Sequence, residues 1–81
     1  MSDRKLKLLA KDLIKSAFGF TVSSNEVVLL EASCDSVNVD YLLFSIKGRS
    51  WIEYRARKTY RGTYETTIVN TQTDEELIVV F

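Results

Sequence analysis

The sequence predicts an α+β fold in which an N-terminal amphipathic helix packs on a mainly antiparallel sheet of four or five strands. Two patterns indicate this class. Before Gly19, apolar residues recur at three- and four-residue steps, as on one face of a helix, and from Val37 onward they alternate with a period of two. The polar stretches between the alternating segments are short, and short connections join antiparallel neighbours. We expect the 81 residues to form a single domain.

The predicted helix occupies most of the chain before Gly19. Ser2 or Asp3 can cap its N-terminus, and Gly19 stands where a glycine commonly ends a helix. A second face carries lysines but no tryptophan, so the helix is expected to pack on its own domain rather than on a membrane. The apolar stripe consists of Leu6, Leu9, Ala10, Leu13, Ile14 and Ala17.

Residues 20–36 fit two interpretations. Ser23 followed by Glu26 is the pattern of a capping box that opens a short helix. The apolar run at residues 27–30 instead fits a buried strand, and its two β-branched residues favour the strand.

Four strands are expected after residue 36, at residues 37–46, 51–60, 64–69 and 77–81. A three-residue loop that ends at Gly62 joins the second and third of these, because glycine readily adopts the left-handed conformation that such a loop needs. This loop sets the register of its hairpin. It pairs Thr59 with Thr63, Arg57 with Glu65, Ala56 with Thr66 and Tyr54 with Ile68.

A two-residue loop, Lys47-Gly48, joins the first two of these strands and predicts that Asp40 faces Arg55 and Phe44 faces Trp51. The Asp40–Arg55 and Arg57–Glu65 pairs then form a charge ladder on one face. The opposite face is apolar and is the predicted core of the sheet, consisting of Val37, Val39, Tyr41, Leu43, Ile52, Tyr54, Ala56, Tyr64 and Ile68.

The composition argues against catalysis. The chain has no histidine and one cysteine, so it lacks the commonest general base and cannot assemble the usual zinc site within one chain. Its three glycines lie far apart, so there is no glycine-rich phosphate loop. We therefore expect no enzyme activity, no cofactor and no metal site. A single cysteine is compatible with a reducing compartment, and a cytoplasmic location is expected.

The leading hypothesis is a non-catalytic binding module, of inhibitor or adaptor type, whose partner is a protein. On the predicted registers, the face that carries the charge ladder also has an apolar end. Tryptophan and arginine on one sheet face are typical anchors of protein interfaces. The candidate partner-binding residues are Leu42, Phe44, Trp51, Arg55 and Arg57.

An alternative hypothesis is binding of single-stranded nucleic acid or RNA. Arginines alternate with aromatic residues near residues 51–61, as bases and phosphates would require. However, Arg55 and Arg57 are each predicted to face a carboxylate, which a phosphate-binding face would not favour. The candidate residues are Arg49, Trp51, Arg55, Arg57 and Arg61. A histidine-free ribonuclease is a third hypothesis that rests on analogy of fold alone.

The apolar segment that begins at Leu77 and ends at Phe81 predicts self-association. The last strand of a meander tends to lie at a sheet edge, and this segment has none of the lysines, prolines or bulges that normally protect an edge. We expect a homodimer through this edge, since closed two-fold dimers are the commonest soluble oligomers. The competing interpretation is that the segment inserts between two other strands.

Overall fold

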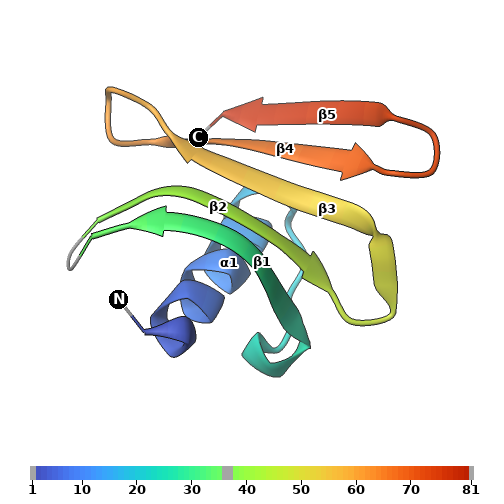
Figure 1. The fold of residues 1–81 in the computed structure, drawn as a ribbon. Helices are drawn as coiled ribbons and strands as arrows, with labels where there is room; N and C mark the ends of the chain where they lie inside the picture. Colours follow the sequence, from blue (N-terminus) through green and yellow to red (C-terminus); the bar gives the residue numbers. More distant parts are fainter. Residues whose placement is uncertain (1, 36–37, 81) are drawn as a thin grey trace.

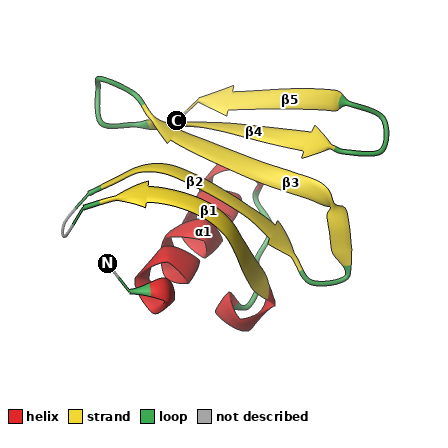
Figure 2. Ribbon diagram, viewed as in Figure 1, coloured by secondary structure: helices red, strands yellow, loops and turns green. Residues whose placement is uncertain are grey.

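The structure is a computed structural model that describes residues 2–35 and 38–80. One helix, α1 (Asp3–Phe18), packs on a five-stranded antiparallel sheet with the strand order β1-β2-β3-β4-β5 (Figure 1, Figure 2). The predicted α+β class is therefore confirmed. The remaining elements are η1 (Ser24–Glu26), β1 (Val27–Cys34), β2 (Val39–Ile46), β3 (Arg49–Lys58), β4 (Tyr64–Asn70) and β5 (Glu75–Val80).

Helix α1 begins and ends where its sequence predicts. The Ser2 hydroxyl oxygen accepts a hydrogen bond from the Lys5 amide at 3.4 Å. Gly19 adopts the left-handed conformation, with φ of 77°, and its amide donates to the Lys15 carbonyl at 3.0 Å. Within the described residues, no helix is long and apolar enough to cross a membrane. The buried face of α1 consists of Leu6, Ala10, Leu13 and Ile14, all members of the predicted stripe.

Both interpretations of residues 20–36 describe part of the structure. Ser23 and Glu26 form a capping box around the single turn η1, in which Glu26 Oε1 accepts a hydrogen bond from the Ser23 amide at 3.1 Å. The chain then enters β1 at Val27. The strand favoured for residues 27–30 is thus confirmed, and the capping pattern closes a short turn before it.

The hairpin of β3 and β4 has the register that its loop predicts. Arg57 lies opposite Glu65, and the pairing is continuous over all of β4. Gly62 has φ of 83°, and the Thr59 amide donates to the Thr63 carbonyl at 2.8 Å, which closes the three-residue loop. The geometry of this loop therefore sets the register of the whole β3–β4 ladder, because no bulge interrupts the pairing.

The predicted register of β2 with β3 is wrong over most of its length. Ile46 lies opposite Arg49, as a two-residue loop requires. The next pair along the ladder is Ser45 with Glu53, so residues 50–52 of β3 have no partner on β2. Side chains alternate between the two faces of a strand. A shift by an odd number of residues therefore places each β2 side chain on the face opposite to the one predicted relative to β3.

The shift removes the pairs that were predicted for this hairpin. Asp40 does not face Arg55, so that member of the charge ladder is wrong, and Phe44 faces Tyr54 rather than Trp51. The Phe44 and Tyr54 rings stack in the core, with centroids 5.3 Å apart and planes 12° apart. Stacking of this kind adds to the stabilisation that burial itself provides.

The shift also changes which side chains of β2 reach the core. Leu42 and Phe44 are both fully buried, whereas Tyr41 and Leu43, predicted for the core, are half-buried on the opposite face. Val37 of the predicted core lies outside the described residues. The core consists of Leu6, Ala10, Leu13, Ile14, Val22, Val27, Val39, Leu42, Phe44, Ile46, Tyr54 and Ala56.

Helix α1 covers only part of the sheet. It packs against β1 and β2, and Phe18 in its last turn reaches Tyr54 of β3, with ring centroids 6.0 Å apart. In Figure 1, β4 and β5 extend beyond the helix. We refer to the face that carries α1 as the inner face. It is a closed core over β1 to β3 and is open at β5, where Leu77 is 57% exposed.

Candidate functional site

Strand β5 forms one edge of the sheet and exposes apolar side chains on both faces. Leu77 lies opposite Ile68 on the inner face, and Ile78 lies opposite Thr67 on the outer face. More than half of each side chain is exposed. The edge position predicted for this segment is confirmed, and its insertion between two strands is wrong. Phe81, the last residue of the predicted segment, lies outside the described residues.

The two edges of the sheet differ in their protection. Strand β1 has register shifts between Leu29 and Glu31 and between Ser33 and Cys34, and its second half is exposed and polar. Strand β5 pairs with β4 in one continuous register, and its two charged residues, Glu75 and Glu76, stand at its start, so the rest of the strand has neither a bulge nor a charged side chain. Bulges and charges along a strand discourage other strands from pairing with it. The β5 edge, defined as Glu75–Val80, is therefore the less protected of the two.

A shallow cavity of about 220 Å³ opens on the inner face beside the β5 edge. Its apolar part lies over β3, β4 and β5, in the part of the sheet that extends beyond the helix, and its polar part lies where β5 begins. A side chain that covered this cavity would remove apolar surface from water and stabilise a complex. The cavity is lined by Ile52, Ile68, Asn70, Glu75, Glu76 and Leu77.

A groove of about 170 Å³ follows the outer face beside the same edge. Its lining contains two arginines and two carboxylates, and Arg57 faces Glu65 across the ladder. The guanidinium carbon of Arg57 also lies 5.6 Å from the centroid of the Tyr41 ring, a cation–π contact. The groove is lined by Arg55, Arg57, Glu65, Thr67, Glu76 and Ile78.

The structure separates the five candidate partner-binding residues. Arg55 and Arg57 line the outer groove. Leu42 and Phe44 are fully buried in the core, so their assignment to an accessible binding surface is wrong. Trp51 is 40% exposed in the segment of β3 that has no partner on β2.

The apolar floor of the inner cavity was not recognised as a candidate site from the sequence. Ile52 and Ile68 were assigned to the core, which is where their register places them. The size of the helix indicates that part of the sheet is uncovered. One helix of 16 residues is about 24 Å long and about 10 Å wide, and it cannot cover five strands spaced about 4.8 Å apart. Part of the predicted inner face therefore had to remain open.

The residues proposed for nucleic-acid binding do not form one surface. Arg49 begins β3, whereas Arg61 lies in the loop that follows it at the other end. Arg61 Nε donates a hydrogen bond to the hydroxyl of Tyr60 at 3.2 Å, and Tyr60 is 92% exposed. Arg55 and Arg57 share their groove with two carboxylates.

Within residues 2–35 and 38–80, no three histidine, cysteine, aspartate or glutamate side chains are close enough together to hold a metal ion. Comparisons of the chain with protein-family models, curated proteins and solved structures found no significant match. The geometry of the β5 edge and of the two hollows beside it is therefore the basis for the functional proposal.

Proposed function

We propose that this chain is a non-catalytic protein-binding module that adds a strand of its partner to the β5 edge, and that the partner is a second copy of the chain. The observation that carries this proposal is the pair of half-exposed apolar side chains, Leu77 and Ile78, on the edge strand with continuous pairing. An added strand would bond to backbone groups of β5 that face away from β4. It would also cover both side chains, which contributes about 1 kcal/mol for each.

The open inner face supports the same site. The added strand lies beside Leu77, and its side chains can cover the cavity floor formed by Ile52 and Ile68. In a small domain the core is limited by size, so apolar surface from a second copy supplements the core that one copy can build. The site thus offers backbone hydrogen bonds together with apolar burial.

The charges of β5 favour a second copy in the antiparallel direction. Antiparallel pairing centred on Leu77 places Glu76 of each copy opposite Ile78 of the other, so that like charges are not opposed. Parallel pairing in register would place Glu75 and Glu76 of one copy beside the same residues of the next, which is destabilising. The antiparallel arrangement has a two-fold axis, and it closes after two copies because β4 already occupies the other side of β5.

Sedimentation equilibrium over a range of micromolar concentrations tests this proposal. We expect the wild-type chain to shift from 9.3 kDa toward twice that mass as the concentration rises. The variant Leu77→Lys should remain at the monomer mass, because two lysines would meet at the centre of the interface. Leu30→Lys is the matched control, since Leu30 is 48% exposed on the β1 edge, and it should associate like the wild type.

A single 9.3 kDa species of the wild type at every concentration would overturn the second copy as partner. Thermal unfolding must first show that Leu77→Lys is folded, so that its monomer mass reports on the interface.

A salt titration of binding to heteropolymeric RNA tests the alternative function, binding of single-stranded nucleic acid or RNA. The mixed charges of the outer groove disfavour RNA, so we expect no binding even at low salt, whereas tight binding that weakens steeply with salt would support a nucleic-acid function instead.

A further inference from the structure

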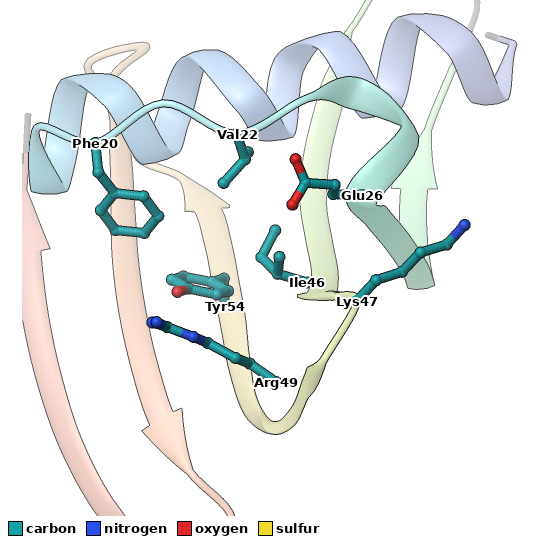
Figure 3. Close-up of a pocket in the computed structure, with 7 residues that line it drawn as sticks. All are labelled: Phe20, Val22, Glu26, Ile46, Lys47, Arg49 and Tyr54. Atoms are coloured by element: carbon teal, nitrogen blue, oxygen red, sulfur yellow. The ribbon is translucent and has the colours of Figure 1, made fainter.

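Another cavity, of about 210 Å³, lies on the inner face between the connection from α1 to η1 and the start of β3 (Figure 3). Its floor is apolar and its rim is charged. Such a combination is characteristic of sites for small molecules, in which apolar walls provide affinity and a few polar groups fix orientation. The cavity is lined by Phe20, Val22, Glu26, Ile46, Lys47, Arg49 and Tyr54.

Tyr54 is a rigid wall of this cavity. Its side chain is 3% exposed, and its ring is held between Phe44, stacked at 5.3 Å, and Phe18, tilted at 6.0 Å. Among the described residues its hydroxyl has no hydrogen-bond partner, whereas the hydroxyl of Tyr64 donates to the Val39 carbonyl at 3.0 Å. Among the described residues the buried side-chain polar atom without a partner is Thr66 Oγ1, so the Tyr54 oxygen instead borders the open space of the cavity. The Tyr54 hydroxyl is therefore a donor available to a bound molecule.

Burial keeps that donor protonated. Desolvation raises the pKa of Tyr54 above its ordinary value of 10.0, and the nearby positive charge of Arg49 opposes this shift without reversing it. In Figure 3 the Tyr54 oxygen and the Arg49 guanidinium lie on the same side of the cavity. A neutral phenol and a guanidinium, side by side, both donate hydrogen bonds.

The charges at the rim are not equally available to a ligand. The Glu26 carboxylate already accepts the hydrogen bond from the Ser23 amide that completes the capping box. Lys47 and Arg49 are exposed cations beside the apolar floor. Figure 3 shows the Glu26 carboxylate away from the Arg49 guanidinium and the Tyr54 oxygen. The groups beside Tyr54 are therefore donors, and the complementary ligand group is an anion with two acceptor oxygens.

We infer that this cavity binds a small monocarboxylate with an apolar body, whose carboxylate accepts hydrogen bonds from Arg49 and from the Tyr54 hydroxyl. The apolar body lies on Val22 and Ile46 and is covered by Phe20, which is 39% exposed above the cavity. The volume limits the body to the size of one aromatic ring or a branched alkyl chain. This inference uses no residue of β5, so it stands or falls independently of the dimer.

Titration of the ¹⁵N-labelled protein with 3-phenylpropanoate, followed by amide chemical shifts, tests the inference. We expect saturable shifts at Val22 and Ile46 and binding about tenfold weaker for the neutral amide, 3-phenylpropanamide, since a hydrogen bond to a charged group is lost. Arg49→Gln and Tyr54→Phe should each weaken binding of the carboxylate. Arg61→Gln, in the loop at the other end of β3, is the control and should bind like the wild type.

Equal affinity for the carboxylate and the amide would overturn the inference, and so would shifts that do not saturate at the solubility limit of the ligand. Arg49 is exposed, so Arg49→Gln is expected to fold even if Tyr54→Phe does not. In that case Arg49→Gln and the comparison with the amide decide the question. Unchanged affinity in Arg49→Gln would show that the carboxylate does not lie where we infer.

Discussion

Thr71 donates two hydrogen bonds to the main chain of Trp51. Its amide and its hydroxyl both donate hydrogen bonds of 2.8 Å to the Trp51 carbonyl, across twenty residues of sequence. Trp51 lies in the segment 50–52, where β3 has no partner on β2. These bonds continue the β3–β4 pairing one residue beyond Asn70, so they hold the start of β3 from the β4 side where β2 offers it no partner.

Thr71→Val keeps the shape of the side chain and removes one of these two hydrogen bonds. We expect the free energy of unfolding to fall by about 0.5–1.5 kcal/mol. The fluorescence of Trp51, the only tryptophan, should change as its segment loosens. Thr21→Val, at an exposed position before η1, is the control for the substitution itself. Urea unfolding of Thr71→Val that is indistinguishable from the control would contradict this role.

The part of the fold that could be predicted from the sequence is the part that nearby residues determine. The caps of α1 at Ser2 and Gly19 and the loop that ends at Gly62 depend on residues within one turn of each other. The register of β3 with β4 follows from that loop because no bulge intervenes. For the same reason the edge position of β5 could be predicted from the order of hairpins in the chain.

The register of β2 with β3 could not be predicted, because the turn that joins these strands does not set it. The Lys47-Gly48 turn forms as expected, but residues 50–52 have no partner on β2, so the pairs beyond them are shifted from those that the turn predicts. Alternation alone did not reveal the error, because Leu42 and Phe44 are as apolar as Tyr41 and Leu43. The predicted register therefore gives an equally apolar core from Tyr41 and Leu43. It places Leu42 and Phe44, which are buried in the structure, in the candidate binding site.

Arg57 and Glu65 are predicted to interact across the β3–β4 ladder. Reversing either charge alone should lower stability, and reversing both should restore most of the loss, with a coupling of about 0.2–1 kcal/mol. A double-mutant cycle by urea unfolding measures this coupling. Asp40 and Arg55 provide a matched negative control, because the register does not oppose them, and their reversals should be additive. Equal coupling in the two cycles would contradict the observed register.

Thr66 is fully buried on the inner face, and its hydroxyl oxygen has no hydrogen-bond partner among the described residues. Thr66→Val removes this unsatisfied group with little change of shape and should stabilise the protein by about 1 kcal/mol. Thr63→Val should have the opposite sign, because the Thr63 hydroxyl bonds to that of Thr59 at 2.7 Å. Thermal unfolding compares the two, and a destabilised Thr66→Val would mean that the hydroxyl has an essential partner.

Stability should decline at alkaline pH. Burial raises the pKa of Tyr54 and of Tyr64 above the ordinary 10.0, and Asp40 adds to the shift of Tyr64. The unfolded chain then loses these protons at lower pH than the folded chain. The free energy of unfolding is therefore unaffected below about pH 10 and falls as the pH rises through the folded pKa values.

Tyr54→Phe removes one of these groups and should make the alkaline decline shallower in urea unfolding above about pH 10. Tyr60→Phe is the control, since Tyr60 is 92% exposed and its replacement should leave the decline unchanged. If Tyr54→Phe follows the wild-type curve, the pKa of Tyr54 is not responsible for the decline.

Hydrogen–deuterium exchange of the backbone amides in Glu75–Val80, measured at several protein concentrations, tests the central claim most directly. Amides of β5 that face away from β4 have no partner in one copy and gain one when a second strand is added. We predict that their exchange slows as the concentration rises through the range in which the mass doubles, while the exposed amides of residues 31–34 on the β1 edge exchange at a constant rate. Exchange in β5 that is independent of concentration, or protection that develops on the β1 edge instead, would contradict the claim that β5 is the binding edge.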